Sequence, residues 1–479
     1  MAKNITPRAE NFPQWYQDVI AAGQLADHAP VKGCMVIRPE GFGIWESLQA
    51  ELDRRFKETG HVNACFPLLI PESFMKREAE HVEGFAPELA VVTKAGGKDL
   101  EEALVVRPTS ETVIGHMYSK WLNSYRDLPI LINQWGNVVR WEKRTRLFLR
   151  TSEFLWQEGH TAHETQREAQ EETLKMLEIY RETLEDYCAI PVFVGEKPDH
   201  DKFAGALKTY ALEAMMQDKK ALQSATSHNL GQNFSKAFGI DFLNRKNQLD
   251  YAWTTSWGLS TRAIGGIIMT HGDDDGIILP PKIAPTKVAV VPIYRSDDER
   301  RQVFEHSDKI AALLKEKLGS LNVKVDRRDN MKPGDKFFTW IQRGVPLRIE
   351  VGPRDVAQNG GTLVRRDNRD KRFCELAEVA ETTEEILNGI QHNLYERAKQ
   401  LQKENTRTAD SYEEFKDVLK GEGGFILAHW DGTVETAEKI QKETKASIRL
   451  IPQDGDASPG KCMVSGNPSK RRVIFALAY

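Results

Sequence analysis

The sequence contains few cysteines, and they lie far apart along the chain. The five are Cys34, Cys65, Cys188, Cys374 and Cys462, and no two of them form a CxxC pair. A disulfide framework needs regularly spaced thiols, and a structural zinc ion needs about four ligands. The spacing therefore predicts neither a disulfide framework nor a standard zinc site.

Long apolar runs and an excess of charge of one sign are also missing. No stretch of about 18 apolar residues occurs, and the first residues, MAKNITPRAENFPQWYQDVI, contain no apolar signal-peptide core. Lys and Arg (66) nearly balance Asp and Glu (70), so net charge alone predicts no nucleic-acid partner, although a local basic patch is compatible with it. These absences predict a cytoplasmic protein that does not associate with membranes.

Length and patterning predict the domain organisation. The 479 residues suggest roughly three domains of about 150 residues each. Residues 1–282 mix amphipathic helices with alternating strands, and the prolines of 278–287 predict a linker. The next residues alternate as βαβαβ units, and a charged helical segment at 393–415 leads into a terminal module. The expected strands are 288–293, 323–328 and 346–352, with helices at 297–318 and 333–343. The pattern predicts an α/β (α+β) protein with domains at 1–282, 286–400 and 401–479.

An expected hairpin within RWEKRTRLFLRTSEFLWQEGHTAHE (140–164) carries an unusual mixture of side chains on one face. With the loop near 144–146, alternation groups Val138, Arg140 and Glu142 on one arm, and Arg150, Ser152, Phe154, Trp156, Glu158 and His160 on the other. A solvated face is one explanation, but aromatic rings in mid-row are unfavourable in water. A buried ion-pair network is another. We favour a ligand cleft floored by the sheet, in which Arg140 and Arg150 hold anionic oxygens and Phe154 faces a heterocycle.

A further arginine lies in WTTSWGLSTRAIGGIIM (253–269). An expected strand gives way near Ser260 to a helix with an apolar face formed by Ala263, Ile264, Ile267 and Ile268. Arg262 then lies in the first helical turn, where a cation opposes the helix dipole at a cost of about 0.3–1 kcal/mol. Either an exposed arginine is tolerated here, or a bound polyphosphate offsets the cost.

Taken in order, these segments resemble the three motifs of the class II aminoacyl-tRNA synthetases. RWE and its returning strand are similar to motif 2 (about 137–160), and GLSTR opening a helix is similar to motif 3 (about 253–270). A helix over 41–59 followed by NACFPLLIP is similar to motif 1 (about 41–71), which in that class builds the dimer interface. Within the class, RPTSE (107–111), RTSEFLWQEGHTAH (150–163) and SATSHNLGQNFSKAF (224–238) resemble the prolyl-tRNA synthetases of the archaeal and eukaryotic-like branch.

This resemblance extends over essentially the whole chain. It implies a class II antiparallel-sheet catalytic domain, a βαβαβ anticodon-binding domain and a small C-terminal module. It further implies a homodimer that activates L-proline with ATP and transfers it to tRNA(Pro).

The resemblance implies a pocket for proline. Thr109 and Glu111 would accept the two N–H donors of the secondary ammonium, although Glu111 also suits the first turn of a helix. The aromatic walls and the histidines would otherwise be taken as ordinary core residues. The residues implied to bind proline are Thr109, Glu111, Arg140, Trp156, Glu158, His160, Phe203 and His228, with Phe85 as a further wall.

A site for ATP is implied beside it. Arg140 would contact the α-phosphate, and Phe154 and Arg262 would enclose the adenine ring, so that Arg140 and Arg262 are the catalytic arginines. Magnesium is expected on the triphosphate, held mainly by phosphate oxygens. The residues implied to bind ATP are Arg140, Glu142, Arg150, Thr151, Phe154, Gln223, Thr226, Thr261 and Arg262.

For the anticodon, the resemblance directs attention to RIEVGPRDVA (348–357) and to the basic run VRRDNRDKRF (364–373). Guanine edges suit Arg and carboxylate partners, although such a run is equally compatible with a solvated surface. The implied residues are Arg348, Glu350, Arg354, Asp355 and Lys371.

Two features depart from relatives of this family. Many carry a four-cysteine zinc site in the terminal module, but here 425–440 has no cysteine and 461–470 keeps only Cys462, so no structural zinc is expected. Bacterial-type relatives also insert an editing domain between motifs 2 and 3. The residues between His163 and Gln223 predict one long helix, a strand and a helix, which leaves no room for it.

Two alternative functions remain open at this point. A synthetase for another amino acid, threonine being the nearest, would place a zinc-ligating cysteine in the pocket strands, where none of the five cysteines lies. An inactive tRNA-binding paralogue would be marked by loss of Arg140, Glu142 or Arg262, and all three are present.

Overall fold

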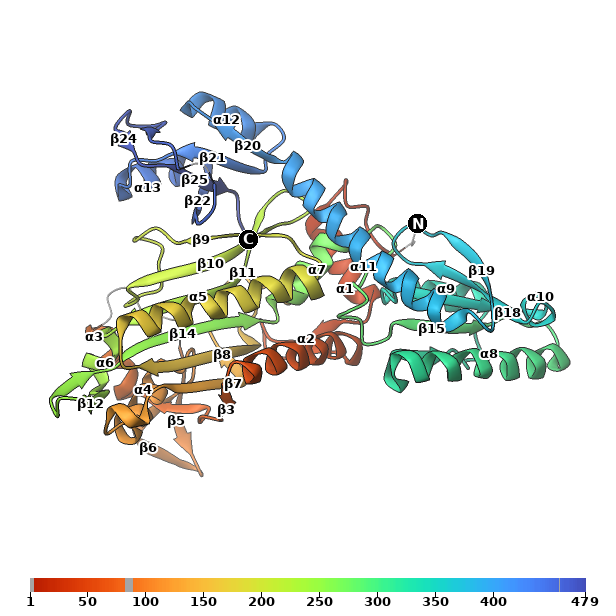
Figure 1. Ribbon diagram of the computed structural model, residues 1–479, viewed down its shortest axis with the longest axis horizontal. Helices are drawn as coiled ribbons and strands as arrows, with labels where there is room; N and C mark the ends of the chain where they lie inside the picture. Colours follow the sequence, from red (N-terminus) through yellow and green to blue (C-terminus); the bar gives the residue numbers. More distant parts are fainter. Residues whose placement is uncertain (1–3, 82–88, 456) are drawn as a thin grey trace.

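The protein is built around one large sheet that crosses from the catalytic part of the chain into the C-terminal part. The computed structural model describes residues 4–81, 89–455 and 457–479. Figure 1 shows the large sheet on the left, a smaller sheet on the right and the C-terminal part above. In spatial order, the strands of the large sheet are β20 (Thr406–Ala409), β21 (Phe425–His429), β25 (Arg472–Ala476), β22 (Ser447–Pro452), β9 (Val192–Glu196), β10 (Lys208–Met215), β11 (Ala221–Gly231), β14 (Trp253–Ser260), β8 (Glu153–His163), β7 (Ile130–Val139) and β3 (Val62–Asn63).

The central strands, from β9 to β7, are antiparallel, as predicted for the catalytic domain. In the β7–β8 hairpin, Val138 lies opposite Phe154 and Gln134 opposite Glu158. Since residues directly opposite each other point to the same face, the row Phe154, Trp156 and Glu158 is continuous with β7.

Helices cover the opposite face of this sheet and leave uncovered the face that carries Phe154, Trp156 and Glu158. α5 (Gln166–Glu182) begins with a capping box formed by Thr165 and Glu168 and packs across β11 and β14. A Cβ on Gly159 would lie 2.1 Å from the Trp257 ring, so only glycine lets β8 pass over this indole. The other helices that pack here are α1 (Phe12–Ala22), α2 (Pro39–Glu58) and α7 (Arg262–His271).

A three-stranded sheet lies near the start of α4 (Glu111–Trp121). Its order is β4 (Leu69–Pro71), β6 (Lys98–Val106) and β5 (Ala90–Ala95). The remaining short elements of this part are β1 (Ala26–His28), β2 (Met35–Ile37), α3 (Glu72–His81), α6 (Asn233–Phe238), β12 (Asp241–Leu243) and β13 (Leu249–Tyr251).

The expected βαβαβ unit is confirmed in a separate five-stranded sheet. β15 pairs in parallel with both β16 and β17, and β18 and β19 extend the sheet in an antiparallel manner. Its elements are β15 (Val288–Pro292), α8 (Asp297–Leu318), β16 (Val323–Val325), α9 (Pro333–Gln342), β17 (Leu347–Val351), α10 (Pro353–Ala357), β18 (Gly360–Arg365), β19 (Lys371–Glu375) and α11 (Val379–Glu404).

The C-terminal part is not an appended unit, because its strand β22 pairs with β9 of the catalytic part through Ile451 opposite Glu196 and Pro452 opposite Gly195. The last residue, Tyr479, donates its backbone N–H to the Ala221 carbonyl at 3.1 Å. Figure 1 accordingly places the C-terminus beside β10 and β11. The helices and short strands of this part are α12 (Tyr412–Lys420), α13 (Val434–Thr444), β23 (Gly460–Lys461) and β24 (Pro468–Ser469).

Several expected elements differ from the structure. The hairpin arms are shorter than expected, because β7 ends at Val139 and β8 begins at Glu153, so 140–152 forms a long loop. The stretch 63–71 is divided between β3 and β4, and the helix expected shortly before Gln223 is strand β10.

The expected connectors were also wrong in part. The prolines of 278–287 do interrupt regular structure, but the segment is largely buried against the core. The helix expected at 393–415 is instead the end of α11, strand β20 and the start of α12. Across the described residues, no helix combines the length and the apolar character needed to cross a bilayer.

Candidate active site

Two adjoining cavities lie over the uncovered face of the large sheet. The larger has a volume of about 320 Å³ and the smaller about 130 Å³. They share a wall formed by Arg140, Trp156, Gln223, Thr226 and Gly258. These residues come from the end of β7 and from β8, β11 and β14, so the antiparallel pairing brings them together.

The alternation of β8 supplies the floor, as the sequence predicted. Phe154 lies in the smaller cavity, Glu158 and His160 in the larger, and Trp156 between them. Ser110 Oγ donates to Glu158 Oε1 at 2.6 Å, and His160 Nε2 lies 2.9 Å from Glu158 Oε2.

Glu158 and His160 shift each other's pKa values. Burial alone would raise the pKa of Glu158, but hydrogen bonds from His160, Ser110 and Gln134 keep it below its usual value. Burial alone would lower the pKa of His160, but the Glu158 carboxylate raises it. Both shifts favour the ionised form of the pair.

The opposite wall of the larger cavity is neutral and aromatic. Burial lowers the pKa of His228 to about 3, helped by the charge of His160, so this imidazole carries no charge at neutral pH. Its Nδ1 lies 3.0 Å from the Thr209 hydroxyl, and the Phe203 ring packs against it with 4.7 Å between centroids.

At the head of α4, the Thr109 hydroxyl donates to the Glu111 carboxylate, and both residues line the larger cavity. Glu111 also occupies the first turn of the helix, so its two expected roles coincide in one place.

Arg140 points between the two cavities. Its Nε donates to the Pro108 carbonyl at 3.0 Å, and its guanidinium lies 5.7 Å and 5.5 Å from the ring centroids of Phe154 and Trp156. Burial lowers its pKa, opposed by the nearby carboxylates of Glu111 and Glu158.

Arg262 closes the smaller cavity from the first residue of α7. Its guanidinium is held by the backbone carbonyls of Leu149 at 3.2 Å and Gln223 at 3.3 Å. Burial lowers its pKa, and the positive charges of Arg150 and Arg140 lower it further. A cation surrounded by other cations is stabilised when an anion binds.

Four residues of the expected nucleotide set are not among the described residues that line either cavity. Glu142 and Arg150 lie on the long loop, 3.9 Å apart and partly exposed. Thr151 donates its hydroxyl to the Glu153 carbonyl at 2.7 Å, and Thr261 is fully buried. Phe85, the further expected wall, lies outside the described residues.

A bulge in β11 explains how Gln223 and Thr226 both reach the cavities although they are three residues apart. Leu212 lies opposite Ala225 and Glu213 opposite Gln223, so Ser224 is left without a partner. The extra residue reverses the alternation of the strand. The residue pattern of β11 did not predict this bulge.

The sequence analysis missed a charged group at the edge of the larger cavity. Lys197, Asp201 and Lys202 line it from the turn after β9, together with Ser256 and Trp257 of β14. A turn with mixed charges gives no signal of its own, because only tertiary folding brings it over the sheet.

In the five-stranded sheet, the expected anticodon residues have unequal surroundings. Glu350 forms salt bridges with Arg348 at 2.7 Å and with Lys371 at 3.2 Å. Asp355 accepts from the Gly352 N–H and the Thr362 hydroxyl, and Arg354 is exposed.

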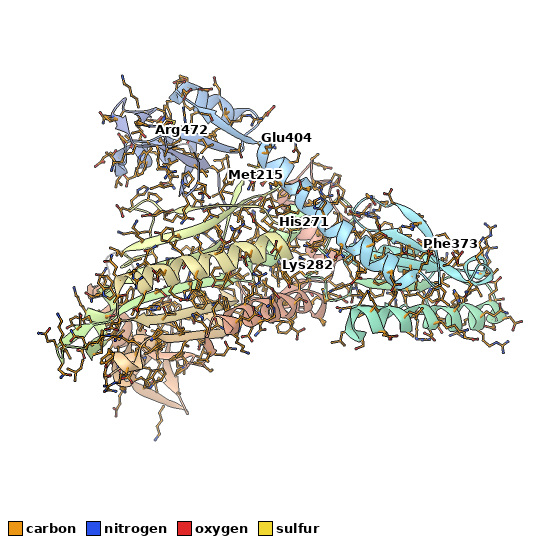
Figure 2. All side chains as sticks on the ribbon, viewed as in Figure 1. Met215, His271, Lys282, Phe373, Glu404 and Arg472 are labelled. Carbon is orange, nitrogen blue, oxygen red and sulfur yellow. The ribbon has the colours of Figure 1, made fainter. Side chains whose placement is uncertain are left out.

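Part of the basic run 364–373 faces inward rather than toward solvent. Arg366 is buried and forms two hydrogen bonds of 2.6 Å with Asp273, just beyond the end of α7. Arg369 reaches Asp275 at 3.0 Å. Figure 2 marks His271, the last residue of α7, where the parts of the chain meet. These two arginines therefore bind the catalytic part of the same chain.

Comparison with known proteins agrees with this architecture. Residues 92–271 match the family model described as tRNA synthetase class II core domain (G, H, P, S and T), and 287–386 match the anticodon binding domain. Residues 412–479 match the model described as prolyl-tRNA synthetase, C-terminal.

Individual relatives are similar over the full length. A Chlorobium luteolum protein named Proline–tRNA ligase is 55% identical over 487 residues, covering 100% of both chains. A Porphyromonas gingivalis protein of the same name is 54% identical over 491 residues, covering 100% of this chain and 99% of the relative. The crystal structure of prolyl-tRNA synthetase from Cryptosporidium parvum, complexed with halofuginone and AMPPNP, superposes with a TM-score of 0.94 at 38% identity, covering 99% of each chain.

The fold and site are those of a class II aminoacyl-tRNA synthetase, and the chain belongs to the prolyl-tRNA synthetase family. The family assignment made from the sequence motifs is confirmed.

Proposed function

We propose that this protein activates L-proline with ATP and transfers the prolyl group to the 3′ end of tRNA(Pro). The observation that carries the proposal is the pair of adjoining cavities with Arg140 between them. One offers carboxylates and aromatic walls, as an amino acid with an apolar ring requires. The other offers arginine and a phenyl ring, as a nucleotide requires. The relative from C. parvum was crystallised with AMPPNP, an ATP analogue, which supports the second assignment.

The larger cavity is assigned to proline. Glu111 and Thr109 accept from the ring nitrogen, while Trp156 and Phe203 enclose the methylenes. The hydrogen-bonded pair Glu158 and His160 and the neutral His228 complete the polar lining.

The smaller cavity is assigned to ATP. Phe154 and Arg262 enclose the adenine, Arg140 contacts the α-phosphate, and Gln223 and Thr226 contact the remaining oxygens. Glu142, Arg150 and Thr151 belong to this site only if the loop 140–152 moves inward when ATP binds. Thr261, fully buried at the N-cap of α7, would reach the nucleotide only if the start of that helix rearranges. A divalent cation, in our proposal Mg²⁺, would neutralise triphosphate oxygens and be held mainly by them.

The mechanism follows from charge. The proline carboxylate attacks the α-phosphorus in line, and prolyl-adenylate forms as pyrophosphate leaves. Two anions must approach each other, so the work of the site is positioning and neutralisation by Arg140 and Arg262. No general base is needed for this step. The terminal ribose hydroxyl of the tRNA then attacks the activated carbonyl, and AMP leaves.

We assign roles to the remaining parts of the chain from the family to which it belongs. Residues 1–282 carry catalysis, 286–400 bind the anticodon through the Glu350 cluster, and 401–479 support the catalytic sheet. The protein acts as a cytoplasmic homodimer. Exposed Val62, Leu68 and Leu69 beside the edge strand β3 support a partner at this edge.

The residues of the C-terminal part do not fit a thiolate zinc site. Cys462 is its only thiol, and His429 Nδ1 lies 3.1 Å from the Ser469 hydroxyl. We expect metal analysis of the purified protein to find less than stoichiometric zinc. About one zinc per chain would show that histidines and carboxylates replace the thiolates.

The test of the function is pyrophosphate exchange. Purified protein should exchange labelled pyrophosphate into ATP when proline is added, and far less with threonine at equal concentration. If threonine supports exchange as well as proline does, the substrate assignment is wrong. If no amino acid supports exchange, the protein is an inactive paralogue.

A further inference from the structure

A buried carboxylate with an unusual partner lies behind the cavities. Glu213 of β10 is fully buried, and Arg449 of β22 donates to its Oε1 at 2.7 Å. Lys197 Nζ lies 3.4 Å from the same oxygen and 2.9 Å from Asp201. Lys197 and Asp201 line the larger cavity, so the C-terminal part reaches the cavity wall through a chain of charges.

The positions of Arg449 and Glu213 are both set by irregularities of the sheet. Between Ile448 and Leu450 the register of β22 against β25 shifts, so Arg449 is the extra residue of a bulge. A bulge turns a side chain out of the regular alternation, here toward β10. Glu213 lies opposite Gln223 at the bulge of β11, and therefore on the face that carries the cavities.

Two polar atoms of this cluster lack hydrogen bonds, which is unusual for a purely structural ion pair. Within the described part of the chain, Glu213 Oε2 and Arg449 Nε have no hydrogen-bond partner. A buried carboxylate in such a position is costly and requires a compensating charge.

Arg449 supplies the charge that balances the group. Glu213 and Asp201 are negative, and Lys197 and Arg449 are positive, so the cluster is neutral. Without Arg449 the charge of Glu213, which lies opposite Gln223 of the wall that both cavities share, would be an excess negative charge beside a site for a polyanion. Glu213 would also draw Lys197 away from the cavity. The charges of Glu213 and Arg449 act in opposite directions on Arg262 as well.

We propose that Arg449 is a positioning residue for ATP: from the C-terminal part it neutralises Glu213, which keeps the cavity wall compatible with the triphosphate. The inference rests on the assignment of the smaller cavity to ATP. It gives the C-terminal part of the chain a role in nucleotide binding through charge.

The experiment compares four variants. Arg449→Met removes the charge, Arg449→Lys keeps it, and Arg449→Met combined with Glu213→Gln removes both charges. Arg472→Met is the matched control, because Arg472 pairs with the exposed Asp410 elsewhere in the same part of the chain. The affinity for a non-hydrolysable ATP analogue is measured by calorimetry, and the KM values for ATP and proline by pyrophosphate exchange.

Arg449→Met should weaken binding of the analogue by about tenfold, as expected for one unit of charge acting through partly screened protein. The KM for ATP should rise in parallel, with the KM for proline little changed. Arg449→Lys and Arg472→Met should stay near wild type. The double variant should recover most of the loss, because the wall is neutral again.

Two results would overturn the inference: unchanged analogue affinity in Arg449→Met, or a double variant no better than Arg449→Met. If Arg449→Met does not fold, the affinity of the single variant Glu213→Gln for the analogue tests the inference. With one excess positive charge in the wall it should bind the analogue as tightly as wild type or more tightly, and weaker binding refutes the proposal. Because calorimetry needs no catalysis, wild-type protein that binds the analogue without exchange would refute the proposed function and leave the inference standing.

Discussion

The cavities and the junction between the catalytic part and the five-stranded sheet both enclose arginines, but they hold them in opposite ways. At the junction, Arg366 is buried, its two terminal nitrogens donate to the Asp273 carboxylate, one of these also donates to the Gly276 carbonyl, and Nε donates to the Ile341 carbonyl. In the cavities, Arg140 and Arg262 are held by backbone carbonyls, and in the described chain neither forms an ion pair.

In our proposal, this difference separates a structural arginine from one that binds a ligand. A guanidinium fully paired with Asp273 has no capacity left for a ligand, and its removal deprives a largely buried carboxylate of its main partner. A guanidinium oriented by carbonyls keeps free donors and forms no ion pair of its own, so an arriving anion can use both its donors and its charge. The sequence alone does not distinguish the two kinds of arginine.

The largest effect is expected at Arg140. Arg140→Ala should lower the rate of proline activation by about 10²–10³, because a preorganised donor to the developing charge is lost. The free energy of unfolding should change little. Pyrophosphate exchange and urea unfolding measure the two, and near-normal exchange would contradict the assignment of Arg140 as a binding arginine.

At the junction the expected effects are reversed. Arg366→Met should lower the free energy of unfolding by about 3 kcal/mol, since breaking a buried ion pair leaves Asp273 with only the 3.4 Å contact of Arg369. The KM values for proline and ATP should stay near wild type in the folded fraction.

The control for this variant is Arg369→Met, whose side chain is 39% exposed. It should cost about 0–1 kcal/mol, as partly exposed pairs do. Equal losses in both variants would mean that burial does not distinguish Arg366.

The pH dependence of stability sharpens the same contrast. Arg366 and neighbouring donors outweigh burial and lower the pKa of Asp273 from 3.8 to about 2. A carboxyl whose folded pKa is depressed stabilises the protein above its unfolded pKa, and the gain is lost as pH falls from about 4 to about 2. The contribution is about 2 kcal/mol. Urea unfolding should show a shallower loss across this range in Arg366→Met than in wild type.

The smallest effect is expected when the ligand changes and the charges do not. Alanine lacks ring methylenes, each worth only about 1–3 kcal/mol of discrimination, while Glu111 and Thr109 can accept from a primary ammonium. We expect detectable alanyl-tRNA(Pro). Residues 164–222 form α5, β9, β10 and their connections, so this segment offers no editing domain. Rapid hydrolysis of pre-formed alanyl-tRNA(Pro) by the protein would contradict this.

Part of the cavity lining was predictable because it depends on local periodicity, whereas Thr109, Glu111, Phe203 and His228 were expected only from the family resemblance. The β8 row from Phe154 to His160 follows from the two-residue repeat of a strand, and Arg262 follows from the switch between strand and helix. The βαβαβ alternation of the five-stranded sheet was predictable for the same reason. The segment before Gln223 was not, since β10 is a strand only through its neighbours β9 and β11.

The sequence by itself determined the family, the order of the elements and the residues that alternate over the sheet, because each depends on residues close together in the chain. Tertiary structure alone decided which charges meet. It joined β22 to β9, placed Arg449 on Glu213 and buried Arg366 against Asp273, pairs separated by 236 and 93 residues. The energy of a charge depends on its burial and its partner, and neither can be read from the charge itself.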